Sequence, residues 1–510
     1  MPSVEDLGGA VAVPHDDDIS GGLEALDRGR DGADPDRANG QFPAGPGLEG
    51  AAALEAEMAT FREKGALDLI PPNRDVRDHV AASTLRALQA RRAHIRGILA
   101  AVLVLLVAGT PAPAASSPPP RVWPGVDVLV AHYTQVLTGK RIGLITHRAA
   151  TGVGGWPTAT ILTLDPRIRV VAFFTPEHGF SGTLRAGVTV PSGATPSRVG
   201  RIPVYSLYAT TRRPSAEMLA GLDALVFDLQ DVGARAYTYI STMALAMQAA
   251  AQYDKLFIVL DRPNPLGGDR VDGPILDPRF ASFIGIYPVP AVHGMTIGEL
   301  ALLFNEGFGI HARLAVVPMS GWRGRMHWED TGLDWFRPSP NIPSPAAAQL
   351  HAATGLLEGT TLSVGAGSAT PFQTVTAGWL RGNQLAARLN GRGLPGVRFE
   401  GISTGSPGRR QNGIRLVLTD RRRFRPAATA LHILDAIHRL HPQVSLFTPP
   451  RNGGRYRFDL VWGTDTVRKA ILRGDPAEWI VASWNADRQW FLAVRQPYLL
   501  YPRGVPYTPR

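Results

Sequence analysis

Short apolar runs alternate with longer helix-like stretches through the middle of the chain, and this alternation limits the fold more than any other feature of the sequence. Four runs are rich in β-branched and aromatic residues and are each followed by polar turn residues: RIGLIT (141–146), VVAFF (170–174), ALVFDL (224–229) and LFIVLD (256–261). Between the last two lies STMALAMQAAAQY (241–253), which is typical of a helix. Alternating strands and helices predict a parallel sheet covered on both faces. We therefore expect an α/β fold with a Rossmann-like domain over residues 120–355.

A further helix is predicted over TIGELALLFNEGFG (296–309). Thr296 is a suitable N-cap, Glu299 completes a capping box, and Gly307 and Gly309 end the helix.

The character of the sequence changes after about residue 355. Three segments are interpreted as strands joined by short helices: GIRLVLTD (413–420), FDLVWG (458–463) and QWFLAVRQPYLLY (489–501). They predict a second, smaller α+β domain, partly barrel-like, over residues 356–510.

The N-terminal part of the chain has two unusual segments. Residues 1–90 are mostly acidic, rich in glycine and proline, and without sustained periodicity, which predicts disorder or an extension upstream of the true translation start. Residues 91–115 resemble a secretory signal peptide, with an arginine-rich start, the apolar stretch Ile98 to Ala108 and an A-x-A-like sequence at 112–114. The apolar stretch is shorter than the roughly 20 residues of a spanning helix. We expect a secreted, periplasmic or cell-envelope protein without a membrane span after cleavage; a short membrane anchor or a buried helix is the alternative.

The composition excludes some chemistry and leaves other choices open. The chain has no cysteine, which excludes disulfides, thiolate catalysis and Cys-ligated zinc. Its net charge of +10 fits a nucleic acid, an anionic membrane surface or an acidic polymer as partner, and equally fits the arginine bias of a GC-rich genome.

Polar and ionisable residues follow all four predicted strands. In open α/β sheets, ligands bind outside the carboxyl ends of the strands, so these residues predict one binding crevice. In chain order they are His147, Arg148 and GVGG (152–155); Glu177 and His178; Asp228, Gln230, Asp231, Arg235, Tyr237 and Tyr239; and Asp261, Arg262 and Asn264.

Several kinds of site are disfavoured by their missing motifs. GVGG is not a complete G-x-G-x-x-G, and the P-loop, nucleophile-elbow and H-E-x-x-H patterns do not occur. His178 and His293 lack a spacing diagnostic of a metal site, so we expect no metal. Paired carboxylates remain, as in glycoside hydrolysis, with Glu177 and one of Asp231, Asp228 or Asp261. Tyrosines 237 and 239 and tryptophans 322, 328 and 335 are candidates for stacking on sugars, although each alone is better interpreted as core.

A set of longer motifs resembles the NamZ-type exo-β-N-acetylmuramidases over about residues 125–510. In order they are IGLIT, TPEHGF, PVYSLY, VFDLQDVGARAYTYISTM, LDRPNPLGG, HGMTIGELA, TGLDW, PSPNIP, LLEGT and VLTDR. The resemblance implies a glycosidase of peptidoglycan recycling. Its partners would be peptidoglycan-derived muramyl saccharides rather than nucleic acid, and it would release N-acetylmuramic acid from the non-reducing end without a cofactor.

The resemblance also implies roles for single residues. Glu177, His178 and Asp231 would be catalytic, with Glu177 the preferred carboxylate and His178 tuning or positioning it. The substrate-binding residues would be Gln230, Arg235, Tyr237, Tyr239, Asp261, Arg262, Asn264, His293 and Asn341.

Two departures from the family pattern bear on the substrate. The family usually has Thr-Asn-Gln where this chain has Thr146, His147 and Arg148, and an arginine where this chain has Ala366. An arginine there would bind the lactyl carboxylate of muramic acid bidentately, which alanine cannot do. Arg381 is a candidate replacement. The alternative function is a non-catalytic cell-wall sugar-binding protein on the same scaffold.

Overall fold

A computed structural model describes residues 122–197, 200–405, 410–450 and 453–503 of the chain. The predicted N-terminal extension and the signal-peptide-like segment lie outside these residues. Within the described ranges, no helix is both long enough and apolar enough to cross a membrane.

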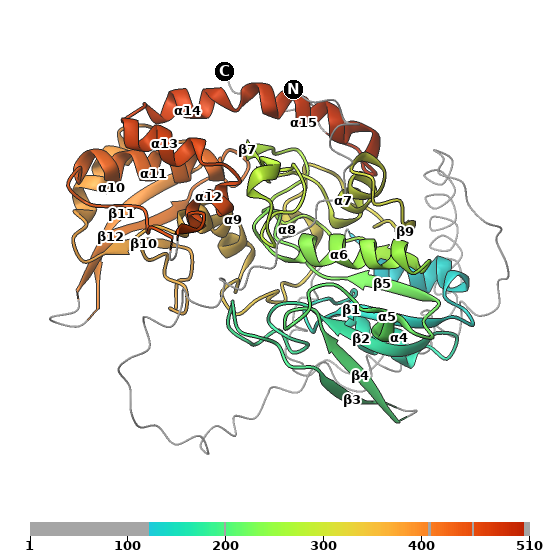
Figure 1. Ribbon diagram of the computed structural model, residues 1–510. Helices are drawn as coiled ribbons and strands as arrows, with labels where there is room; N and C mark the ends of the chain where they lie inside the picture. Colours follow the sequence, from blue (N-terminus) through green and yellow to red (C-terminus); the bar gives the residue numbers. More distant parts are fainter. Residues whose placement is uncertain (1–121, 198–199, 406–409, 451–452, 504–510) are drawn as a thin grey trace, which may run out of the picture. The chain divides into compact units, whose positions relative to one another are not determined.

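A seven-stranded sheet is the centre of the first half of the structure (Figure 1). Its strands, in spatial order, are β3 (Gly193–Ser197), β4 (Gly200–Ser206), β2 (Arg169–Thr175), β1 (Arg141–Thr146), β5 (Ala224–Asp228), β6 (Leu256–Leu260) and β9 (Arg313–Val317). All neighbouring pairs are parallel except β3 with β4. The predicted α/β class is confirmed, and the four predicted strands are β1, β2, β5 and β6.

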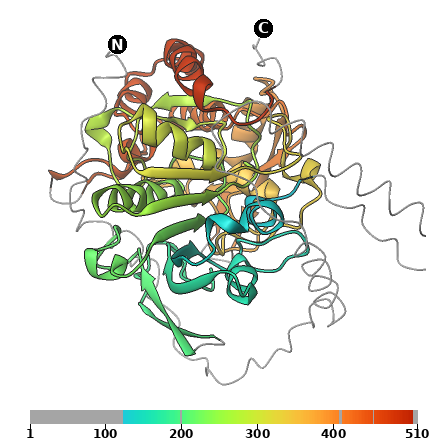
Figure 2. The ribbon, with the colours of Figure 1, turned by 90° about the vertical axis from the view of Figure 1, so that its right-hand side faces the viewer.

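Alternate residues of each central strand enter two different hydrophobic cores. In β5, Leu225 and Phe227 belong to the core that contains α6 (Tyr239–Gln252), whereas Val226 belongs to the core that contains α4 (Thr158–Leu164). Helices therefore cover both faces of the sheet (Figure 2). Each fully buried side chain of this kind stabilises the fold by about 1.5–3 kcal/mol.

The helix predicted at 296–309 begins as expected. Thr296 and Glu299 form a capping box at the start of α7 (Ile297–Leu302), and the helix continues as a π-helical turn that ends at Gly307. The helix predicted at 241–253 is α6, which begins two residues earlier.

The second half of the structure is α+β, as predicted. A three-stranded antiparallel sheet has the order β10 (Thr374–Ala377), β12 (Gln411–Leu418), β11 (Val397–Thr404). Its core includes residues of α9 (Pro345–Thr354), α10 (Gly382–Asn390) and α11 (Pro426–Leu440).

Two of the three strands predicted in this half are wrong. Residues 458–463 fall largely in helix α12 (Arg457–Trp462), and 489–501 fall largely in helix α15 (Asn485–Arg495) and the turn after it. In α12 the buried apolar residues are Phe458, Val461 and Trp462, which is the i, i+3, i+4 spacing of one helix face. A short apolar run is compatible with a strand or with a buried helix. In both segments, packing against the rest of the structure favours the helix.

The remaining elements are short. They are α3 (Gly125–Val128), α5 (Ala216–Leu219), β7 (Asp272–Ile275), β8 (Pro290–Val292), α8 (Trp328–Thr331), α13 (Thr466–Arg473) and α14 (Ala477–Ser483), with single turns of 3-10 or π helix between them.

Candidate active site

The order of the strands reverses at β1, and this reversal locates the candidate site. From β1 the chain moves to β2 and β4 on one side and returns to β5 on the other. Ligands of doubly wound sheets bind at the carboxyl ends of the strands beside such a reversal. The loops that start there carry His147 after β1, Glu177 after β2 and Asp231 after β5.

Glu177 is held on both of its carboxylate oxygens. Oε1 accepts a hydrogen bond from the N–H of Gly187 at 2.9 Å, and Oε2 accepts one from Thr238 Oγ1 at 2.7 Å. The side chain is therefore oriented by the loop after β2 and by the residue that precedes α6. It keeps 8% of its surface exposed.

His178 fixes the loop that reaches Glu177. Its Nδ1 donates to the carbonyl of Leu184 at 2.8 Å, and Leu184 N–H donates back to the carbonyl of His178 at 3.1 Å. The residue has φ of +72°, a left-handed conformation that costs a non-glycine residue about 1–3 kcal/mol. Strain of this size beside Glu177 is typical of a functional turn.

Asp231 lies against His293 on the other side of the reversal. Asp231 Oδ2 accepts from Gly233 N–H at 2.7 Å and lies 3.7 Å from His293 Nε2. Burial raises the pKa of Asp231 to about 7, although hydrogen bonds from Gly233 and Val232 oppose the shift. The carboxyl group therefore carries a proton for part of the time at neutral pH.

His293 is a neutral hydrogen-bond donor. Burial, followed by the charges of Arg495 and Arg235, lowers its pKa to about 3. Its Nδ1 accepts from Met295 N–H at 3.2 Å, so the single ring proton lies on Nε2, the nitrogen that faces Asp231.

Several buried polar atoms at this edge of the sheet have no hydrogen-bond partner among the described residues. They are Asp231 Oδ1, Gln230 Oε1, His147 Nε2, His293 Nε2 and the hydroxyl of Tyr237. Buried polar atoms are normally paired, so a cluster of unpaired ones marks a place that binds a polar molecule. Gln230 uses its amide group to donate to the carbonyls of Asp231 and Pro263, both at 2.8 Å, which leaves Oε1 as an acceptor.

His147 resembles His293 in its protonation. Burial lowers its pKa to about 3, and its Nδ1 accepts from Ala149 N–H at 2.9 Å. The ring proton is therefore on Nε2, and the ring packs edge-on against Tyr239. Among the described residues, no group of three His, Asp or Glu side chains is placed to hold a metal ion.

Arg262 is engaged by a buried network. It pairs with Asp228 (Nη2 to Oδ2, 2.8 Å) and donates to the carbonyl of Thr151 at 2.9 Å. The glycine-rich loop after Thr151 is also held by Asp127, whose two carboxylate oxygens accept from Val153 N–H at 3.1 Å. That N–H points at a protein carboxylate and so is not free for a phosphate.

Arg235, Asp261 and Asn264 also have protein partners. Arg235 is fully buried and donates to the carbonyls of Pro274, Val289 and Val461, the last of them in α12. Asp261 accepts from Thr296 Oγ1, Gly298 N–H and the hydroxyl of Tyr501, and Asn264 bonds Leu266 and Met295. Contact of these three residues with substrate stays a prediction; their present bonds shape the loops around the site.

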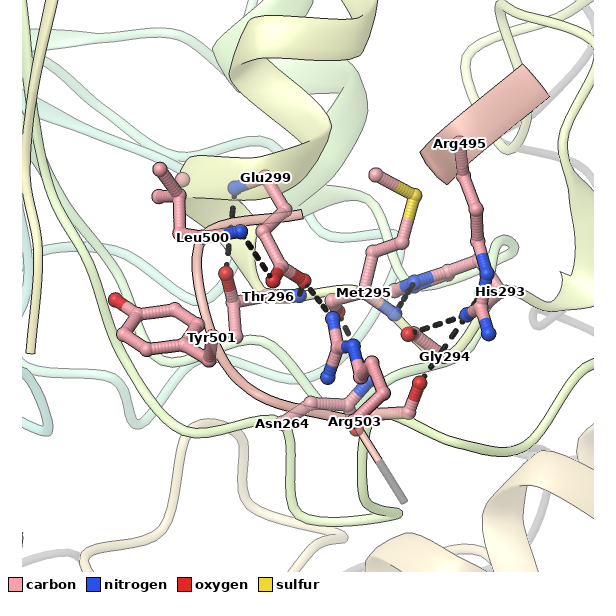
Figure 3. Close-up of polar contacts among 12 residues, drawn as sticks. Asn264, His293, Gly294, Met295, Thr296, Glu299, Arg495, Leu500, Tyr501 and Arg503 are labelled. Carbon is pink, nitrogen blue, oxygen red and sulfur yellow. Dashed lines mark hydrogen bonds and ion pairs between the residues drawn. The ribbon is translucent and has the colours of Figure 1, made fainter. Parts of the chain in front are cut away.

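The C-terminal segment holds the loop that carries His293 (Figure 3). At the end of α15, Arg495 donates to the carbonyls of His293 and Gly294 at 3.1 and 2.7 Å. Glu299, in the first turn of α7, accepts from Leu500 N–H at 3.0 Å and pairs with Arg503. The second half of the chain thus positions a side chain of the first.

Asn341 and the two tyrosines connect the site to the second half of the chain. Asn341 Oδ1 accepts from Gly367 N–H at 2.9 Å, next to Ala366. Tyr237 packs edge-on against Tyr239 and against His351 of α9. Trp322 and Trp328 are buried in the protein, which favours a core role for them.

Four residues that contribute to this arrangement were not among the predicted site residues. Gly187 and Thr238 bind Glu177, Arg495 holds His293, and Tyr208 lies beside Glu177. Thr238 lies within the motif VFDLQDVGARAYTYISTM, and Tyr208 is the last residue of PVYSLY, so the motifs contained a signal for both. Nothing in the sequence connects Gly187 or Arg495 with the site.

Comparisons with known proteins agree with this geometry. The N-terminal family model of exo-β-N-acetylmuramidase NamZ matches residues 142–346, and the C-terminal model matches residues 349–501. The chain is 41% identical over 417 residues, 79% of its own length and 99% of the relative, to the peptidoglycan β-N-acetylmuramidase NamZ of Bacillus subtilis (strain 168).

Two solved structures from Bacteroides fragilis NCTC 9343, both described as DUF1343-family proteins, have similar folds. One has a TM-score of 0.69 and 34% identity and covers 75% of this chain and 100% of its own. The other has a TM-score of 0.58 and 31% identity and covers 75% of this chain and 99% of its own. The family resemblance of the motifs is thereby confirmed: this chain is a glycosidase that belongs to the NamZ exo-β-N-acetylmuramidase family.

Proposed function

We propose that this protein releases N-acetylmuramic acid from the non-reducing end of peptidoglycan-derived muramyl saccharides. The observation that carries the proposal is the placement of Glu177 and Asp231 on opposite sides of the strand reversal, among unpaired buried polar atoms. The activity in the name of the Bacillus subtilis relative supports the same substrate class.

Glycoside hydrolysis needs one carboxyl group that donates a proton and a second that acts as a base or nucleophile. Glu177 is the carboxylate that the motifs favour, and we propose it as the proton donor. Asp231 is the second candidate, because its pKa of about 7 allows it to hold a proton at neutral pH. His178 orients the loop around Glu177, and Nε2 of the neutral His293 faces Asp231 Oδ2 at 3.7 Å, beyond hydrogen-bond distance.

The reaction is tested with two chromogenic β-N-acetylmuramides, one with a good leaving group and one with a poor leaving group. The wild type should cleave both, and the corresponding β-N-acetylglucosaminides more slowly. Loss of the proton donor should slow the poor leaving group far more than the good one, since only the poor one needs protonation. Comparing Glu177→Gln with Asp231→Asn on both substrates therefore assigns the two roles. No cleavage of any muramide by folded wild-type protein would instead support the non-catalytic sugar-binding alternative.

We also propose that the protein is exported, in agreement with the signal-peptide-like residues 91–115 and with a cell-wall substrate. N-terminal sequencing of the protein from culture medium or envelope fractions should find a start near Ala114 or Ala115. A mature N-terminus before residue 90 would contradict this.

A further inference from the structure

Arg212 lies on two aromatic rings at the same edge of the sheet as Glu177. Its guanidinium carbon is 4.3 Å from the ring centre of Phe283 and 5.5 Å from that of Tyr208. Both rings are buried, so the guanidinium rests on a rigid surface. Stacking of this kind uses the flat face of the guanidinium and leaves the N–H groups at its edge free to donate.

The strand pairing places Arg212 near the catalytic edge. β4 runs parallel to β2, with Ser206 opposite Thr175, and Leu207 N–H donates to the carbonyl of Thr175 at 2.8 Å. The loop after β4 therefore leaves the sheet beside the loop that carries Glu177, and Arg212 lies on this loop.

Tyr208 connects Arg212 electrostatically with Glu177. Burial raises the pKa of Tyr208 above its usual value, and the negative charge of Glu177 raises it further, whereas the positive charges of Arg212 and Arg457 oppose the shift. All three charges thus act on one buried hydroxyl.

Two cations, Arg212 and Arg457, act on Tyr208, and of these Arg212 is the one that lacks an anionic partner among the described residues. Among the described residues, its side chain makes no ion pair and no hydrogen bond. Arg457 pairs with Glu358 at 3.1 Å, and the neighbouring Arg213 donates to Gln248 and Gln252 of α6. An unneutralised guanidinium that is half-buried over two aromatic rings, on the loop beside the one that carries Glu177, has the character of an anion-binding group.

Building on the proposed function, we propose that Arg212 binds the lactyl carboxylate of the muramyl residue and so selects acidic over neutral N-acetylhexosamines. The muramyl sugar differs from N-acetylglucosamine by this ether-linked carboxylate, and a planar guanidinium binds a carboxylate through two parallel hydrogen bonds. Ala366, with its methyl side chain, offers no such contact.

The first test measures binding and does not depend on turnover. Isothermal titration compares N-acetylmuramic acid, its lactyl methyl ester and N-acetylglucosamine on the wild type, Arg212→Gln and Arg212→Lys. Hydrogen bonds to a charged group contribute about 1.5–3 kcal/mol, so Arg212→Gln should weaken binding of the acid by roughly 10–150-fold. Binding of the two neutral sugars should change by less than about threefold, and Arg212→Lys should recover part of the loss, since it keeps the charge but loses the bidentate geometry.

Arg213→Gln is the matched control, because it removes the same charge from the neighbouring residue, which faces α6 instead. It should leave the preference for the acid unchanged. In turnover assays, Arg212→Gln should raise KM for the muramide with little change in kcat. Equal loss of acid and ester binding in Arg212→Gln, or no loss of either, would overturn the role of Arg212.

The two proposals fail in different ways. A wild type that binds the acid through Arg212 but cleaves no muramide contradicts the proposed hydrolysis and leaves the role of Arg212 standing. A wild type that cleaves muramides and their methyl esters equally well contradicts only the role of Arg212.

Discussion

His293 Nε2 lies 3.7 Å from Asp231 Oδ2; both groups are buried, the imidazole is neutral, and the carboxyl group is only partly ionised near neutral pH. Such a pair differs from a salt bridge, because the imidazole is neutral and the carboxyl group is partly protonated. Ionisation of Asp231 should therefore lower the free energy of unfolding as pH rises, whereas ionisation of a salt-bridged aspartate raises it.

The free energy of unfolding of Asp231→Asn should rise relative to that of the wild type as pH rises from 4 to 8. The folded-state pKa of Asp231, about 7, exceeds its usual value of 3.8, so between these values the folded state binds a proton that the unfolded state has released. Ionisation of the buried carboxyl thus destabilises the wild type as pH rises, whereas asparagine does not titrate. Denaturant unfolding at several pH values measures the difference, which should reach a few kcal/mol.

Asp254→Asn is the control, because it removes the same charge from an exposed position, and it should show no such trend. If the difference between Asp231→Asn and the wild type is also independent of pH, Asp231 is not the titrating group.

Glu177→Gln should lower kcat on a poor leaving group by at least about 100-fold, because general acid–base catalysis typically contributes 10²–10⁴-fold. Glutamine keeps an oxygen that accepts from Gly187 N–H, and its amide N–H can donate to the Thr238 hydroxyl in place of the bond that Oε2 accepts, so the unfolding temperature should change little. Steady-state kinetics with a circular-dichroism melt tests both points, with the exposed Glu306→Gln as control. Rates within about threefold of the wild type would move the acid–base assignment to Asp231 or Asp261.

Arg495→Met should change the pKa of His293 and, through it, the pH profile of kcat, although Arg495 does not contact Asp231. The guanidinium holds the carbonyls of His293 and Gly294, and its charge helps to lower the pKa of His293. We expect a higher pKa of His293, measured by NMR titration, and a shifted pH profile of kcat. Arg495→Lys, which keeps the charge, should restore much of the profile. A change in stability with no change in either pH measurement would reduce Arg495 to a purely structural residue.

Gly233→Ala should be more damaging than Gly154→Ala, although both glycines have a left-handed φ (+80° and +89°). A Cβ at Gly154 meets nothing within 4 Å, so alanine there should cost only the backbone strain of about 1–2 kcal/mol. A Cβ at Gly233 would lie 2.3 Å from Asn264 Oδ1, and the N–H of Gly233 holds Asp231. Stability and kcat measured on both variants should show a loss of activity confined to Gly233→Ala. Equal activities would mean that Asp231 does not depend on this turn.

The residues that follow the strands illustrate how far a site can be predicted from sequence. Glu177 and Asp231 were identified because the carboxyl ends of parallel strands share one edge of a sheet. The same rule selected Arg235, Asp261 and Arg262, whose hydrogen bonds in the structure go to protein groups. These partners are up to 240 residues away in the chain, so no local pattern distinguishes them from groups open to a ligand.

The sequence by itself determined the α/β class, the four central strands, the capping box of α7 and the family. These follow from local periodicity, from side chains three residues apart and from long motifs, which need no knowledge of distant contacts. Only the tertiary structure decided that β5 returns beside β1, that residues 457–462 and 485–495 are helices, and that Arg212 stacks on Tyr208 and Phe283 near Glu177. Each of these depends on which surfaces pack together, and the free energy of packing is a property of pairs of segments that are distant in the chain.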